Sequence, residues 1–206
     1  MLRRFTQVDV FASSAYLGNA LAVVLDAEGL GTEEMQRFAR WTNLAETTFL
    51  LPPSTPGADY RARIFTTEGE LPFAGHPTLG SCHAWLEAGG KPHTDGVVVQ
   101  ECQAGLVPLR VTDEGLAFQA PALMRSGPVE EELLARIAAS LGIARGDIVA
   151  AEWADNGPGW VGVLLADAEA VLALRPGPVP HEVGVAGPYP AGSPCAFEVR
   201  AFSSTG

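Results

Sequence analysis

The sequence predicts an α+β protein that divides into two units of strands and a few helices. Stretches rich in β-branched and aromatic residues outnumber stretches with helical periodicity. Several of these strand-like stretches follow one another across a glycine turn, which is typical of hairpins and meanders. The character of the chain changes near residues 126–128, where a new helix and a new set of strands begin. We therefore predict a first domain over residues 1–120 and a second over residues 127–206.

The composition is that of an acidic globular protein. The chain has 206 residues, 47% of them hydrophobic, and a net charge of -11 with no basic run, so nucleic acid and anionic lipid are not expected partners. No apolar run reaches the roughly 20 residues of a membrane helix, and the N-terminus does not resemble a signal peptide. Cys82, Cys102 and Cys195 are odd in number and widely spaced. We expect a reduced, cytoplasmic protein without a membrane or nucleic-acid partner.

The first domain begins with two strands joined by a glycine turn, over residues 4–12 and 19–27. A helix over residues 32–42 follows, because its apolar positions recur at i, i+3, i+4 and i+7 and two glutamates lie in its first turn. Two more strands are expected over residues 46–53 and 60–67, with turn residues between them.

A second helix is predicted to begin at His76 or Pro77, because the period of the apolar residues changes there. Proline suits the first turn of a helix, and Gly89 and Gly90 suit its end. We expect a buried helix, one face of which carries Leu79, Cys82, His83 and Leu86, with His83 either in the core or on the helix surface. Strand-like stretches over residues 96–105, 106–115 and 116–123 then predict a meander.

The second domain is predicted to begin with a helix over residues 129–142. A hairpin over residues 147–168 turns at the sequence DNGPG. Residues 174–194 are rich in proline and glycine and leave room for one short strand, and residues 195–202 read as a final strand.

The stretch GELPFAGHPTLG, residues 69–80, carries the first candidate site. A helix N-terminus presents free N–H groups and a partial positive charge, and Gly75 would let an anion come close to the backbone. His76 could hold a substrate oxygen or relay a proton near neutral pH. The alternative is a capping or packed histidine. His83 lies seven residues on, but no third donor has metal-site spacing, so we expect no metal.

Two further candidates lie earlier in the chain. Glu46 stands at the start of a strongly apolar strand, where desolvation would raise its pKa toward the range that suits proton transfer. The alternative is an exposed carboxylate at a strand end. Asn19 follows a flexible glycine and could orient a polar substrate, although such pairs also form simple turns.

Together, the stretches GNALAVV, AETTFL and PFAGHPTLG resemble, in order and spacing, the motifs of the phenazine biosynthesis PhzF-like family. The resemblance implies a diaminopimelate-epimerase-like fold of two similar domains, each a curled, mainly antiparallel sheet around a central helix, with the active site in the cleft. It implies a cofactor-independent isomerase of a small carboxylate. Glu46 would be the acid/base that moves a proton, and Gly75 and His76 would bind substrate and help to stabilise the proton in transfer, so that His76 is also a catalytic residue.

The chain also departs from that family. Its relatives continue after a strand like VRAF with an acidic loop of the type EDPVTGS, which carries a second catalytic carboxylate and begins a second central helix. We therefore expect a C-terminally truncated chain with an incomplete second domain, and a homodimer that covers its open sheet. Two alternatives stay open. One is a racemase or epimerase of a small carboxylate, for which related enzymes use paired cysteines, and the other is an inactive relative with a binding or structural role.

Overall fold

The computed structural model describes residues 2–204 and divides the chain into two compact units. Unit 1 comprises Met1–Pro121 and unit 2 comprises Ala122–Gly206. Each unit has its own sheet and its own buried core, so each is described by itself. No helix in the described part of the chain is both long enough and apolar enough to cross a membrane.

Unit 1 contains a sheet of eight strands within the described residues, mostly antiparallel. Its path runs β1–β2–β3–β4–β6–β7–β8, and β5 pairs with β4 beside this path. Only the β2–β3 and β4–β6 pairs are parallel. The strands are β1 (Phe5–Val10), β2 (Asn19–Val24), β3 (Glu46–Leu51), β4 (Tyr60–Phe65), β5 (Glu70–Leu71), β6 (Val97–Cys102), β7 (Gly105–Thr112) and β8 (Gly115–Phe118).

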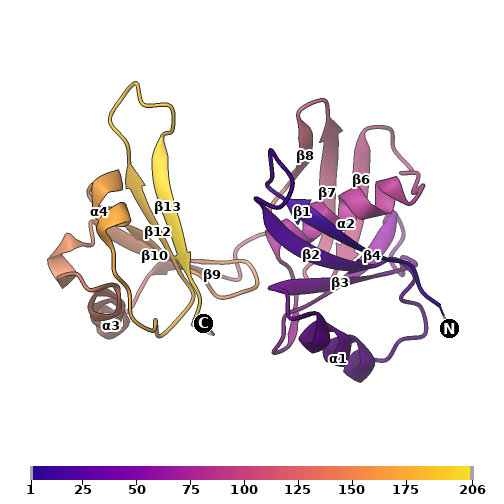
Figure 1. Ribbon diagram of the computed structural model, residues 1–206, viewed down its shortest axis with the longest axis horizontal. Helices are drawn as coiled ribbons and strands as arrows, with labels where there is room; N and C mark the ends of the chain where they lie inside the picture. Colours follow the sequence, from indigo (N-terminus) through magenta and orange to yellow (C-terminus); the bar gives the residue numbers. More distant parts are fainter. Residues whose placement is uncertain (1, 205–206) are drawn as a thin grey trace. The chain divides into compact units, whose positions relative to one another are not determined.

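Two helices pack on opposite faces of this sheet. Helix α1 (Thr32–Thr42) contacts β3 and β4 and buries Met35 against Phe49 and Phe65. Helix α2 (Gly75–Glu87) lies within the curl of the sheet and contacts six of its strands, from β1 to β8. In Figure 1, α2 is surrounded by strands, whereas α1 lies outside them next to β3. The α2 side forms the larger core, in which Cys82 packs among apolar residues of the sheet.

Unit 2 contains a five-stranded sheet in the order β13–β12–β11–β10–β9 within the described residues. Its helices α3 (Glu131–Leu141) and α4 (Ala168–Ala173) bury apolar side chains in one common cluster with Trp153, Val163 and Val185. A short 3-10 helix spans Arg145–Asp147. The strands are β9 (Arg125–Pro128), β10 (Ala150–Asp155), β11 (Val161–Leu164), β12 (Val183–Pro188) and β13 (Phe197–Phe202).

The structure confirms the predicted fold class and most of the predicted elements. Helix α2 begins at Gly75, before the predicted start, because proline fits anywhere in a first turn, where N–H groups have no partner within the helix. Strand β5, strand β9 and helix α4 were not predicted. The two strands are short and polar or glycine-containing, and α4 is a six-residue helix with an N-terminus capped by Asp167, whose carboxylate accepts from Ala170 N–H at 2.8 Å.

Candidate active site

Three of the predicted site residues meet at one end of the unit 1 sheet. Asn19 begins β2 and Glu46 begins β3, and the parallel register of these strands places Leu21 opposite Glu46. His76 is the second residue of α2, which starts at the same end. Its Nδ1 atom lies 3.3 Å from Asn19 Nδ2 and 3.5 Å from Glu46 Oε2. The sheet register therefore brings together side chains that are far apart in the sequence.

His76 is a neutral, largely buried imidazole. Its side chain is 9% exposed, and burial lowers its pKa to about 4. With Asn19 Nδ2 as the hydrogen-bond donor, Nδ1 accepts and the ring proton resides on Nε2. Nε2 is buried and has no hydrogen-bond partner among the described residues. The ring thus offers one unused N–H donor, which is unusual for a buried polar group.

Burial brings the pKa of the Glu46 carboxyl group close to neutral pH. Its side chain is 17% exposed, and burial raises its pKa to about 7. Its Oε2 atom is buried and accepts no hydrogen bond from the described part of the chain. The 3.5 Å approach to His76 has the distance of an ion pair. Burial nevertheless disfavours both charges, so we interpret the contact as one between weakly charged groups.

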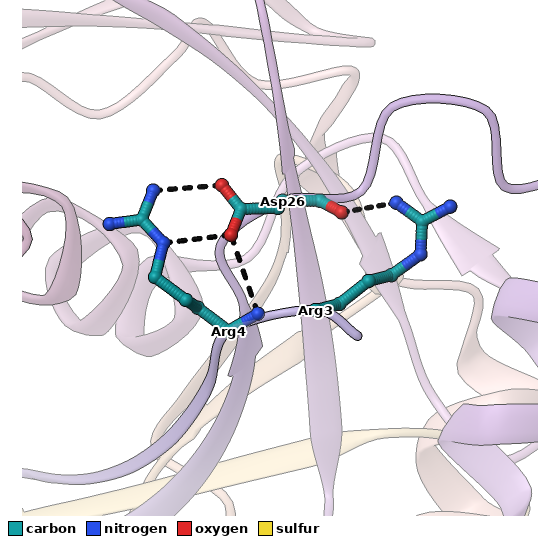
Figure 2. A network of polar contacts seen from close by, with 3 residues as sticks. All are labelled: Arg3, Arg4 and Asp26. Atoms are coloured by element: carbon teal, nitrogen blue, oxygen red, sulfur yellow. Dashed lines mark hydrogen bonds and ion pairs between the residues drawn. The ribbon is translucent and has the colours of Figure 1, made fainter. Parts of the chain in front are cut away.

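A surface carboxylate of the same unit shows the opposite behaviour. Figure 2 shows Asp26 between Arg3 and Arg4, with Arg4 Nε at 2.7 Å and Nη2 at 2.8 Å from its two carboxylate oxygens. Arg3 donates to the Asp26 backbone carbonyl. The hydrogen bonds from Arg4 lower the pKa of Asp26 to about 2. The pKa of Glu46 is therefore raised because its carboxyl group is buried and no arginine donates hydrogen bonds to it, as Arg4 does to Asp26.

The N-terminus of α2 carries no capping side chain and no acid in its first turn. Helix α1 differs, because Glu33 and Glu34 lie in its first turn and Glu34 accepts from Gly31 N–H at 2.9 Å. At α2, the N–H groups of Gly75 and His76 precede the first intrahelical bonds, and Pro77 has no N–H. Such an uncapped end favours a negative charge. Gly75 also has a packing reason, because a Cβ there would lie 3.1 Å from the Phe118 ring.

A buried hydrogen-bond chain fixes the start of α2 to the sheet. Tyr60 Oη donates to Gln100 Oε1 at 3.0 Å, and Gln100 Nε2 donates to Thr78 Oγ1 at 3.0 Å. Thr78 Oγ1 in turn donates to the carbonyl of Ala74 at 2.9 Å. We define these residues, Tyr60, Gln100, Thr78 and Ala74, as the polar chain. No sequence pattern predicts this chain, although the one glutamine of β6, which follows three valines, is a signal for a buried polar contact.

The cysteines and the remaining histidine of α2 lie outside this group of residues. Cys82 and Cys102 are buried, and burial raises the pKa of both thiols, that of Cys82 to about 12. Cys195 is exposed and lies in unit 2. His83 is exposed, so of the two positions left open for it, the core and the helix surface, it occupies the surface. Within the described residues, no group of three or more histidine, cysteine or acidic side chains could hold a metal ion.

Comparison with known proteins shows which family the chain resembles. The chain is 41% identical over 180 residues to antisense-enhancing sequence 1 of Schizosaccharomyces pombe, covering 84% of this chain and 60% of that protein. It is 38% identical over 177 residues to trans-2,3-dihydro-3-hydroxyanthranilate isomerase of Pseudomonas aeruginosa, covering 85% of this chain and 62% of that protein. The chain therefore spans about 60% of the length of these relatives.

A solved structure of the same family has a similar fold. The phenazine biosynthesis protein of the PhzF family from Bacillus anthracis matches the whole of this chain and 73% of its own, with a TM-score of 0.75 and 25% identity. The family model described as phenazine biosynthesis-like protein matches residues 8–205, and so includes all four predicted site residues. The chain therefore belongs to the phenazine biosynthesis-like protein family.

Proposed function

We propose that this chain is an isomerase that moves a proton on a small carboxylate substrate, with Glu46 as the acid/base. The observation that carries the proposal is the pair of unpartnered buried atoms, Glu46 Oε2 and His76 Nε2, beside an uncapped helix N-terminus. Buried polar atoms without partners are rare in stable cores and are typical of sites that a ligand completes. Relatives named as isomerases support the same reaction class.

The roles follow from the charges. The uncapped N–H groups at Gly75 and His76 would bind the substrate carboxylate, and Nε2–H of His76 would donate to a further substrate oxygen. Asn19 would hold the imidazole in that tautomer through Nδ1. Glu46, with a pKa near 7, exists in both forms at neutral pH and so can both take and return a proton.

The proposed step conserves all atoms. The Glu46 carboxylate takes a proton from one carbon of an allylic substrate, and the double bond shifts as the electron pair of the broken C–H bond moves into the conjugated system. The resulting carboxylic acid exchanges its proton with water and then delivers a proton to the far carbon, which restores the carboxylate. A general acid/base of this kind contributes roughly 10² to 10⁴ in rate.

The test is isomerisation of trans-2,3-dihydro-3-hydroxyanthranilate, the compound named for the Pseudomonas aeruginosa relative, in deuterated water. We expect deuterium in the product and a rate that falls by about 10² to 10⁴ in Glu46→Gln. Glu87→Gln is the matched control, because Glu87 is an exposed acid at the opposite end of α2. Full activity in Glu46→Gln would contradict the proposal. Carboxylate binding without turnover by the wild-type chain would favour the inactive-relative alternative.

A two-thiol racemase has less support in this chain. Such a mechanism needs two thiols that ionise at the site, whereas Cys82 and Cys102 are buried with raised pKa values. Thiol alkylation should therefore leave activity unchanged. The cytoplasmic location and the homodimer predicted from the sequence stay predictions.

A further inference from the structure

Two fully buried threonines, Thr47 and Thr48, follow Glu46 on β3, and each contacts a different helix. Successive residues of a strand point to opposite faces of the sheet, so Thr48 shares the face of Glu46 and Thr47 lies on the other face. Thr47 Oγ1 lies 2.9 Å from Thr42 Oγ1 of α1. Thr48 Oγ1 accepts a hydrogen bond from Ser81 Oγ of α2 at 2.9 Å. The two hydroxyls therefore connect the strand that carries Glu46 to helices on opposite faces of the sheet.

The hydroxyl of Thr48 joins all three elements that carry the candidate site. Besides accepting from Ser81, which is also fully buried, it donates to the Ala22 carbonyl of β2 at 3.5 Å. We name Ser81, Thr48 and Ala22 the hydroxyl link. The link connects α2, β3 and β2. These elements carry the three site residues that lie close together, His76, Glu46 and Asn19.

The link lies close to the site along both of its main elements. Thr48 is two residues after Glu46, which is about 7 Å along β3. Ser81 is five residues after His76, which is about 7.5 Å along α2. Apart from the contact between Glu46 and His76, the bond between Ser81 and Thr48 is the one side-chain polar contact between β3 and α2 among the described residues. It therefore sets the spacing of these elements together with their apolar packing.

The site itself does little to hold the Glu46 carboxyl group in place. Glu46 Oε2 accepts no hydrogen bond from the described residues, and it lies 3.5 Å from His76 Nδ1. That nitrogen already accepts from Asn19, so in this tautomer it has no proton to donate to Glu46. The position of the carboxyl group against the imidazole therefore depends on how β3 and α2 are held together. A misplacement of about 1 Å in a reacting pair can cost about 100-fold in rate.

We propose that the hydroxyl link positions the Glu46 carboxyl group against the His76 imidazole, with Thr48 and Ser81 as positioning residues for the proton transfer. This inference rests on the proposed function and adds two residues to its site. Both residues act through the elements that carry Glu46 and His76. Thr47 offers an internal comparison, because it is the same residue type, is equally buried and is bonded to the other helix.

The test compares Thr48→Val with the matched control Thr47→Val, since each replaces one buried hydroxyl by a methyl group of similar size. The measured quantity is the pKa of Glu46, followed by carboxyl-carbon NMR. Loss of the link leaves the Ser81 hydroxyl without its acceptor, so α2 shifts from β3 and water reaches the carboxyl group. We expect Thr48→Val to lower this pKa from about 7 by about one unit, and Thr47→Val to leave it unchanged.

Turnover of trans-2,3-dihydro-3-hydroxyanthranilate gives a second measurement. In Thr48→Val, kcat should fall by about 10- to 100-fold while KM changes by less than about threefold. Thr48→Ser keeps the hydroxyl and should retain both kcat and the pKa of Glu46, although its missing methyl group lowers the free energy of unfolding. Ser81→Ala removes the same bond from the helix side. The double variant Thr48→Val/Ser81→Ala should therefore lose no more than either single variant.

An unchanged pKa of Glu46 in Thr48→Val and Ser81→Ala would overturn the inference. An equal shift in Thr47→Val would also overturn it, because any lost buried hydroxyl would then loosen the site. If Thr48→Val does not fold, Ser81→Ala decides alone, since alanine suits a helix. The proposed function fails in a different way. A wild type without turnover, but with a Glu46 pKa that depends on Thr48, would leave the inference standing. Full turnover in Thr48→Val, with turnover lost in Glu46→Gln, would overturn the inference and leave the proposed function intact.

Discussion

The sheets of the two units share one pattern of strand pairing and differ in the helices that pack on their two faces. In unit 1, β1–β2–β3–β4 pair in antiparallel, parallel and antiparallel order, and β10–β11–β12–β13 of unit 2 repeat that order. The helix between the two parallel strands is α1 in unit 1 and α4 in unit 2, and each contacts the last two strands of its set. Only unit 1 adds a second helix, α2, on the opposite face among the described residues.

The register makes this comparison residue by residue. Thr47 pairs with Phe65, and Val183 pairs with Phe202. When these two pairs are superposed, Glu46 and Glu182 are equivalent, because each directly precedes the first residue of its pair. Glu182 Oε1 accepts from Ser204 N–H at 2.9 Å and from Ser204 Oγ at 2.8 Å. Glu46 Oε2 is buried and accepts no hydrogen bond from the described residues. An acid at one position of the same pattern thus accepts hydrogen bonds in unit 2, whereas in unit 1 its buried Oε2 accepts none from the described residues.

The largest effect is expected from the polar chain, all of whose residues lie in unit 1. Gln100→Leu leaves the buried Tyr60 hydroxyl without its acceptor and Thr78 without a donor, so we expect a loss of about 3 to 4 kcal/mol. Hydrogen exchange should show faster opening of unit 1 and unchanged unit 2. Adding Tyr60→Phe should restore part of the loss. Uniform destabilisation of both units would contradict the assignment.

The next effect is a pH dependence that separates Glu46 from Glu182. Burial raises the pKa of Glu46 from 4.5 to about 7, so between these values the folded state binds more protons than the unfolded state. This group therefore lowers stability as the pH rises, by up to about 3 kcal/mol at pH 7.5. His76, with a pKa lowered from 6.5 to about 4, acts in the opposite direction, raising stability between those values.

Glu46→Gln removes the first of these contributions. The variant should match the wild type at pH 4.5 and be more stable above pH 7, as measured by urea unfolding followed at unit 1. Glu182→Gln is the matched control at the equivalent register position and should show no such gain at high pH, because it loses hydrogen bonds from Ser204. A constant difference between Glu46→Gln and the wild type across this range would contradict the raised pKa.

A smaller loss is expected where α2 lies close to the sheet. A Cβ on Gly80 would lie 2.6 Å from Leu21 Cδ2 and 2.9 Å from Val10 Cγ2. The overpacking of Gly80→Ala should outweigh the better helix propensity of alanine and cost about 1 to 2 kcal/mol. Because the helix must shift away from β2, we also expect weaker carboxylate binding. Calorimetry with propanoate checks this, and unchanged affinity would mean that the shift does not reach His76.

The sequence allowed the elements around the site to be predicted better than the interactions that make it unusual. Period and turn residues predicted β2, β3 and α2, and the order of motifs singled out Asn19, Glu46 and His76, which lie close together in the structure. The missing partner of Glu46 Oε2 and the donor role of Asn19 depend on the parallel register of β2 and β3, which no local pattern specifies. The polar chain joins β4, β6 and α2 for the same reason. Helix α4 was missed because six residues give too short a period to read.

The smallest effect is expected on the unit 2 sheet, at a glycine whose surroundings are the reverse of those of Gly80. Gly184 lies on β12 on the face opposite the buried Val183 and Val185, and the nearest atom to an added Cβ would be Trp160 Cε3 at 3.9 Å. The methyl group of Gly184→Ala has room in the folded state, and alanine lowers the conformational entropy of the unfolded chain. The variant should therefore raise the free energy of unfolding by about 0.5 kcal/mol. Changes of opposite sign in the free energy of unfolding for Gly80→Ala and Gly184→Ala would show that α2 packs tightly on its face of the unit 1 sheet. A loss of more than about 1 kcal/mol in Gly184→Ala, measured by urea unfolding, would exceed ordinary surface effects and mean that this face of unit 2 is itself tightly covered.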